Sequence, residues 1–258
     1  MRASRPFEDF VTARTRPLLL AVFLTAIGCG GDTDRTTVTV LAASSLTDAF
    51  TDVGERFEAA HPGYDVRLGF AASSDLARQV LEGAPADVYA SADPDQVDRL
   101  VAAGITAEPP IIFARNTLAI AVAPGNPLGI TGLGDLDDSD LVLVVCAPEV
   151  PCGAYAAAAF DLADTALQPA SFESNVKSVV TKVALGEADA GIVYRTDVIA
   201  AGGSVDGVAI PAGAGVVADY PVVRLSGAPN ATGSLEFVEF LLGPVGRTAL
   251  ADHGFVVP

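Results

Sequence analysis

Two stretches of the chain place serine hydroxyls directly after a predicted strand and at the start of a predicted helix. They are AASSL at residues 42–46 and FAASSDL at residues 70–76. Small side chains let a ligand approach the backbone, and a helix start offers unpaired N–H groups and a partial positive charge. Because both starts would follow adjacent parallel strands, the pair predicts an anion-binding site at the carboxyl edge of a sheet.

Each motif taken singly has an ordinary explanation, because serine is a common helix N-cap. A serine hydrolase on an α/β scaffold is another possible function, with Ser45 or Ser73 as the nucleophile. Such a nucleophile needs a positioned base. The chain has only two histidines, His61 and His253, and no G-x-S-x-G motif, so the hydrolase is the weaker alternative.

The elements that must hold these serines alternate between strands and helices, which is typical of an α/β fold with a largely parallel sheet. The predicted strands cover residues 37–42, 65–70, 87–91, 111–123, 141–146, 190–194 and 221–225. The predicted helices begin at Ser45, at Ser73 or Ser74 and after an Asn175 cap, and others cover residues 95–103, 153–162, 234–242 and 244–253.

No repeat or low-complexity linker divides the chain, so we expect two α/β lobes that share crossing segments. The strand at residues 111–123 would lead out of the first lobe, and residues 215–221 would lead back into it. The prediction is a first lobe of residues 37–114 plus 221–258 and a second lobe of residues 115–220.

The composition limits the classes of partner. The 258 residues include 15 Lys and Arg against 32 Asp and Glu, which gives a net charge of −17. Nucleic acid is excluded as a partner because phosphate contacts need clustered cations, and docking on an anionic membrane surface is disfavoured. With two histidines a His-rich metal site is nearly excluded, so we expect no direct ligands to a metal cation.

The N-terminal segment has the pattern of a targeting signal. Four Arg precede a short apolar run at residues 17–27, and the Ala-Ile-Gly-Cys sequence that ends at Cys29 resembles a bacterial lipobox. This predicts a signal peptide at residues 1–28, a lipid chain on Cys29 and a tether at residues 29–36. An ordinary secretory signal with an incidental cysteine is the alternative. Without residues 1–28, 11 Lys and Arg face 30 Asp and Glu, a net charge of −19.

Two further cysteines, Cys146 and Cys152, would then lie in an oxidising compartment. Their spacing allows a disulfide that closes the loop at residues 147–151, for which the chain-entropy model gives about 2 kcal/mol. Two buried free thiols are the alternative.

Longer stretches resemble a known family. Residues 70–93 (FAASSDLARQVLEGAPADVYASAD) and residues 186–197 (GEADAGIVYRTD) are similar to the molybdate-binding proteins of ABC-type molybdate importers. Residues 42–50, 173–194 and 243–255 fit the same pattern, so the resemblance covers essentially the whole chain after the signal peptide. It implies a type 2 periplasmic binding-protein fold, whose two lobes, joined by two crossovers, close over a tetrahedral dianion, molybdate or tungstate.

The resemblance also assigns ligand roles residue by residue. It implies hydroxyl donors at Ser45, Ser73 and Tyr194 and backbone donors at Cys152 and Val176. The residue types agree, because hydroxyls donate hydrogen bonds and Val176 would be the first residue of a helix, where N–H groups lack partners. Cys152 departs from the alanine expected there, a change that a backbone donor tolerates.

The resemblance implies a receptor that hands molybdate to a membrane permease. Together with the N-terminal signal, it leads us to expect a monomer outside the cytoplasm, attached to the membrane only through its lipid. Neither catalysis nor a cofactor is expected. A sulfate- or phosphate-binding protein is the main alternative, because the sequence does not give the radius of the cavity. A structural or adhesive lipoprotein is a further alternative, but it would not need paired serine helix starts.

Overall fold

The computed structural model describes residues 35–211 and 215–258, which belong to one compact unit, Asp34–Pro258. The predicted signal peptide, Cys29 and all but the last two residues of the predicted tether lie outside the described residues. No helix in the described part of the chain is long and apolar enough to cross a membrane.

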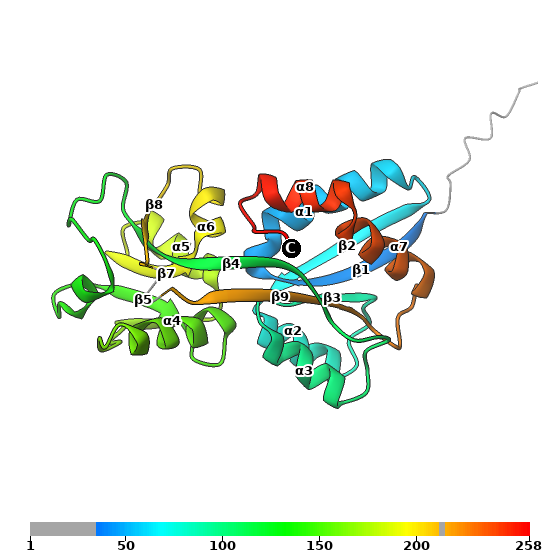
Figure 1. The fold of residues 1–258 in the computed structure, drawn as a ribbon, viewed down its shortest axis with the longest axis horizontal. Helices are drawn as coiled ribbons and strands as arrows, with labels where there is room; N and C mark the ends of the chain where they lie inside the picture. The colour runs from blue at the N-terminus through cyan, green and yellow to red at the C-terminus, as the bar shows by residue number, and fades with distance from the viewer. Residues whose placement is uncertain (1–34, 212–214) are drawn as a thin grey trace, which may run out of the picture. The chain divides into compact units, whose positions relative to one another are not determined.

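One set of elements, called group I here, is built around three parallel strands. β1 (Thr36–Ala43) lies between β2 (Tyr64–Ala71) and β3 (Val88–Ala90). Figure 1 shows α1 and α8 on one face of these strands and α2 and α3 on the other. The helices of group I are α1 (Thr47–Ala60), α2 (Ser73–Leu81), α3 (Pro94–Ala102), α7 (Ala231–Leu242) and α8 (Pro244–Asp252).

A second set, called group II, repeats this plan. β5 (Leu143–Cys146) lies between β6 (Ser171–Glu173) and β7 (Ala190–Tyr194), and the three strands are parallel. Each of these strands leads into a helix. Group II also contains α4 (Pro151–Leu162), α5 (Val176–Ala184), α6 (Arg195–Ala200), β8 (Asp206–Ala209) and the short 3-10 helix η2 (Leu133–Asp137).

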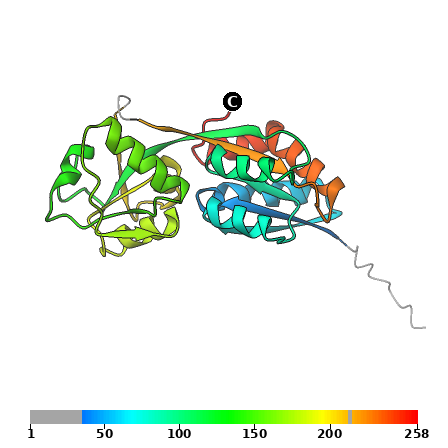
Figure 2. The ribbon, with the colours of Figure 1, turned by 90° about the horizontal axis from the view of Figure 1, so that it is seen from below.

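Two strands join the groups and are called the crossing strands here. They are β4 (Ile111–Val122) and β9 (Val217–Arg224), which run side by side between the groups in Figures 1 and 2. The first half of β4 pairs with β9 and its second half with β7 and β8, always antiparallel. The described sheet is therefore parallel within each group but antiparallel at the crossing strands, in the order β2-β1-β3-β9-β4-β7-β5-β6.

Most predicted elements are present within a few residues of their predicted bounds. Four short elements, β6, β8, α6 and η2, were not predicted, and β9 begins at Val217 rather than at residue 221. The predicted division into two lobes stays a prediction, because groups I and II belong to one compact unit.

The ordinary explanation of the serine motifs, that the serines are helix N-caps, is wrong. The N-cap position of α2 is occupied by Ala72, and Ser73 is the first residue inside the helix. Ser45 lies inside a short 3-10 turn, η1 (Ser44–Leu46), which precedes α1 and has Ala43 at its cap. No side chain caps either start, so both serine hydroxyls are available for other partners.

The apolar faces predicted from helical spacing are buried. In α1, Phe50, Val53 and Phe57 are fully buried, and the ring of Phe57 meets that of Phe237 edge-on at 5.4 Å. Buried residues of groups I and II belong to one continuous apolar cluster. This packing holds the carboxyl ends of both sets of parallel strands in fixed positions.

Candidate functional site

A small cavity lies where the carboxyl ends of the two sets of parallel strands meet. It has about 10 Å³ of free space, which is room for about one water molecule. All five residues with a predicted ligand role line it. The lining residues are Ala43, Ser44, Ser45, Ala72, Ser73, Ala92, Val150, Pro151, Cys152, Val176 and Tyr194.

Tyr194 contributes a hydroxyl without a partner. It is the last residue of β7 and is fully buried, and its hydroxyl has no hydrogen-bond partner among the described residues. A buried polar group without a partner costs free energy, so such a group at the wall of a cavity indicates a missing acceptor. Burial raises the pKa of Tyr194 well above its usual value, and the nearby Tyr220 adds to this shift. The hydroxyl therefore keeps its proton and can donate it.

Ser73 is also arranged as a donor. Its hydroxyl oxygen accepts a hydrogen bond from the backbone N–H of Ala92 at 3.0 Å. The hydroxyl of Tyr89 donates to the carbonyl oxygen of Ser73 at 2.8 Å and fixes the start of α2. Because a hydroxyl has one proton, the proton of Ser73 is left for an acceptor in the cavity.

The group II wall adds backbone donors from two helix starts. Asn175 caps α5, as predicted, by accepting the N–H of Ser178 at 3.1 Å. Val176 is then the first residue of α5, and Cys152 is the second residue of α4, after Pro151. The N–H groups of a helix's first turn have no partner within the helix, so Val176 and Cys152 each bring a free donor to the cavity.

A disulfide shapes the Cys152 side of the cavity. Cys146, at the end of β5, is joined to Cys152 over a separation of six residues. The loop between them turns so tightly that Gly153 lies against it: a Cβ there would be 2.1 Å from the carbonyl oxygen of Ala147. The bridge and the glycine together fix where the N–H of Cys152 points.

Among the described residues, charged groups lie beside the cavity but do not line it. The ammonium of Lys177, on α5, contacts Asp48 of α1 at 2.7 Å and Asp197 of α6 at 3.6 Å. The first of these pairs joins group I to group II. Asp197 is fully buried and accepts the N–H of Tyr194 at 3.1 Å, but its other oxygen has no hydrogen-bond partner among the described residues.

Burial raises the pKa of Asp197 to about 7, and the positive charge of Lys177 opposes this shift. Between about pH 4 and 7 the folded protein therefore holds a proton that the unfolded chain has lost, so stability falls as pH rises through this window. We expect Asp197→Asn to remove this dependence. Urea unfolding measures this at pH 4.5 and pH 7.5. Between these pH values the free energy of unfolding of the wild type should fall by about 2–4 kcal/mol more than that of the variant. An equal fall in the two proteins would contradict a raised pKa for Asp197.

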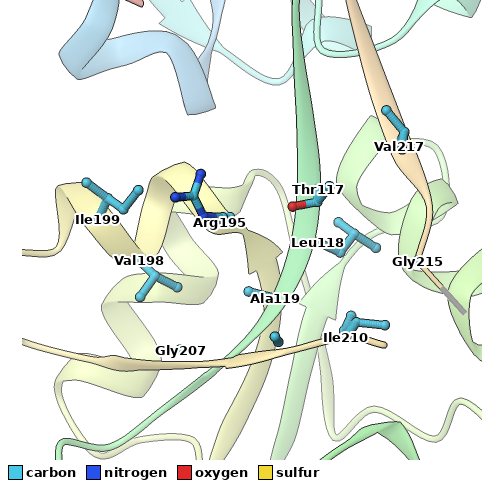
Figure 3. Close-up of a pocket in the computed structure, with 11 residues that line it drawn as sticks. Thr117, Leu118, Ala119, Arg195, Val198, Ile199, Gly207, Ile210, Gly215 and Val217 are labelled. Atoms are coloured by element: carbon cyan, nitrogen blue, oxygen red, sulfur yellow. The ribbon is translucent and has the colours of Figure 1, made fainter. Parts of the chain in front are cut away.

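A much larger cavity, of about 570 Å³, lies elsewhere and was not predicted. Figure 3 shows residues from α6, β4, β8 and β9 around it. Its walls are mostly apolar, with Leu118, Val198 and Ile210 among them, and Arg195, the one cationic group among the described lining residues, donates to the carbonyl oxygen of Gly254. The described part of its wall lacks the converging donors of the small cavity, so we place the functional site at the small cavity.

Two residues that the sequence did not identify lie directly behind the cavity wall. The hydroxyl of Tyr220 lies 2.9 Å from that of Ser45, and the amide of Asn116 lies behind Tyr220. Both are buried, and both are on crossing strands. No local pattern marks them, because Tyr220 is 175 residues from its partner.

Comparison with known proteins gives matches over most of the chain. The pattern of the bacterial extracellular solute-binding proteins matches residues 38–256. The molybdate-binding protein ModA of Mycobacterium tuberculosis is 42% identical over 221 residues, covering 86% of this chain and 85% of that protein.

Two solved structures are similar in fold. The periplasmic molybdate-binding protein of Azotobacter vinelandii has a TM-score of 0.77 at 18% identity, covering 86% of this chain and 99% of that one. The sulfate-binding protein SubI of M. tuberculosis has a TM-score of 0.77 at 20% identity, covering 86% of this chain and 87% of that one. The expected periplasmic binding-protein fold is thereby confirmed.

Proposed function

The chain belongs to the bacterial extracellular solute-binding protein family, and from this we propose that it captures molybdate and delivers it to the permease of an ABC-type importer. The observation that carries the proposal is the buried hydroxyl of Tyr194, which has no partner among the described residues and lies at the wall of a cavity lined by helix starts. The 42% identity to a protein named for molybdate binding supports the choice of ligand. Tungstate, the second ligand expected from the sequence, has the same shape and charge.

The chemistry of the cavity wall supports a fully ionised oxyanion. Ser73 and Tyr194 offer hydroxyl protons, Val176 and Cys152 offer backbone N–H groups, and none of the described lining residues is charged. A tetrahedral dianion accepts hydrogen bonds through all its oxygens, and bonds to a charged partner are the stronger ones. Neutral donors can therefore hold a dianion although the protein is strongly acidic.

Sulfate is the second candidate, because a sulfate-binding protein has the same fold with the same TM-score. Sulfate and molybdate differ mainly in size, and the small cavity must open by side-chain or group movement to admit either. The 42% identity to the molybdate-binding protein ModA favours molybdate. Competition between the two anions for one site decides the choice.

We further propose that the protein acts as a receptor without catalysis, held outside the cytoplasm by a lipid on Cys29. A serine hydrolase would need a base beside its nucleophile, and the hydroxyls of Ser45 and Ser73 have a tyrosine hydroxyl and a backbone N–H as partners instead. Groups I and II would act as the two lobes, and ligand would favour their closed arrangement.

Isothermal titration of the purified protein with molybdate tests the proposal. We expect one site per chain at micromolar protein, with tungstate competing and sulfate competing weakly. Native mass spectrometry should report the added oxyanion. Absence of binding to both molybdate and tungstate would refute the proposal, and equal competition by sulfate would move the assignment to a sulfate receptor.

The response of affinity to salt tests whether neutral donors carry the binding. The net charge of −17 opposes an incoming dianion, and moderate salt screens that field over distances beyond about 8 Å. We expect the dissociation constant for molybdate to stay level or to fall as NaCl rises from 20 to 200 mM. A steep loss of affinity would reveal a cationic site instead.

A further inference from the structure

We propose that Tyr220, backed by Asn116, is a positioning residue that turns the hydroxyl proton of Ser45 into the cavity. The inference rests on the proposed function, because the ligand that receives this proton is the captured oxyanion. Ser45 lines the cavity, whereas Tyr220 and Asn116 lie behind it. They would act on the ligand only through Ser45.

A continuous set of buried polar groups carries the proposal. The hydroxyls of Ser45 and Tyr220 are 2.9 Å apart. The amide nitrogen of Asn116 lies 3.5 Å from the Tyr220 hydroxyl and 2.8 Å from the hydroxyl of Thr196. Tyr220 is fully buried, and the other three side chains are at most 6% exposed.

The direction of these hydrogen bonds follows from Asn116. Its side-chain oxygen accepts the backbone N–H of Thr117 at 3.0 Å, which leaves its NH₂ group facing Tyr220 and Thr196. An NH₂ group can only donate, so the oxygen of Tyr220 is an acceptor and its proton goes to Ser45. The proton of Ser45 is then free for the cavity, as that of Ser73 is.

The four buried polar residues also connect group I to group II. Ser45 belongs to group I, Tyr220 and Asn116 lie on the crossing strands β9 and β4, and Thr196 belongs to α6 of group II. Tyr220 therefore joins a ligand donor of one group to the strand that leads into the other. A donor oriented in this way is fixed before ligand arrives, which lowers the cost of binding.

Fixed donors also affect selectivity. With Tyr220 donating to it, Ser45 can present only a proton, which suits an oxyanion without protons of its own. Phosphate near neutral pH carries a proton and needs an acceptor. Without Tyr220 the Ser45 hydroxyl is free to rotate and accept, so discrimination against phosphate should weaken.

A double-mutant cycle tests the proposal, with molybdate as the probe and calorimetry as the measurement. Tyr220→Phe keeps a ring to pack against Phe113, Tyr194 and Phe255 and removes only the hydroxyl. We expect it to raise the dissociation constant about fivefold in the wild type. In a Ser45→Ala background the same change should have no effect within twofold. The affinity ratio of molybdate to phosphate should fall in Tyr220→Phe alone.

The outcomes separate the two proposals. If wild type binds neither molybdate nor tungstate, the proposed function fails. If wild type binds and Tyr220→Phe costs the same fold-change in both backgrounds, Tyr220 is merely structural and the positioning role is overturned. If Tyr220→Phe does not fold, Asn116→Leu is the second variant. We expect it to raise the dissociation constant for molybdate two- to threefold, and only where Ser45 is present.

Discussion

Tyr194→Phe is expected to raise the dissociation constant for molybdate about 10- to 100-fold, because a hydrogen bond to a charged group contributes about 1.5–3 kcal/mol. Its hydroxyl is buried at the cavity wall and has no partner among the described residues, so ligand is its only acceptor. For the same reason, the ligand-free variant should be as stable as the wild type or more stable. Calorimetric titration and thermal unfolding without ligand measure the two effects.

The variant should lose affinity without losing stability, and this combination distinguishes a ligand donor from a structural residue. A tyrosine that served only to stabilise the fold would lose stability and affinity together on truncation. Tyr64→Phe is the matched control, since Tyr64 is a partly exposed residue of the outer strand β2 and should leave affinity unchanged. Unchanged affinity in Tyr194→Phe would remove this hydroxyl from the proposed donor set.

The sequence predicted the elements whose signals are local. Asn175 was predicted as a cap and accepts the N–H of Ser178, because cap and helix lie within four residues. The spacing of Cys146 and Cys152 likewise suggested the bridge that the structure contains. The six-residue helix α6 was missed because it is too short to show a helical period.

The candidate site could be predicted only in part. Its lining residues follow strands and precede helices, so the order of elements identifies them. Neither Ser73 nor Ser74 is the N-cap, because α2 begins directly after Ala72, and the start of a helix cannot be placed from sequence to within one residue. Tyr220 and Asn116 could not be found, since the pairing of β4 with β9 brings Asn116 to Tyr220, and only the fold brings Tyr220 to Ser45.

Gly153→Ala is expected to lower the free energy of unfolding by about 1–3 kcal/mol and to weaken molybdate binding at least tenfold. A Cβ at Gly153 would lie 2.1 Å from the carbonyl oxygen of Ala147 and 2.6 Å from that of Cys146, both backbone atoms. The loop or the start of α4 must move, and the N–H of Cys152 moves with it. Gly134→Ala is the control, because no atom lies within 4 Å of its added Cβ.

The disulfide between Cys146 and Cys152 should determine how much stability and affinity Gly153→Ala loses. The bridge ties Cys146 to Cys152, and the N–H of Ala147 donates to the backbone carbonyl oxygen of Glu173 at 2.8 Å. The loop therefore cannot easily move away from an added methyl group. In a Cys146→Ala/Cys152→Ala background, which keeps the backbone donor, the loop is released. Gly153→Ala should then cost less stability and less affinity than in the bridged protein. An equal cost in both backgrounds, measured by urea unfolding and titration, would mean that the glycine alone positions the donor and the bridge does not.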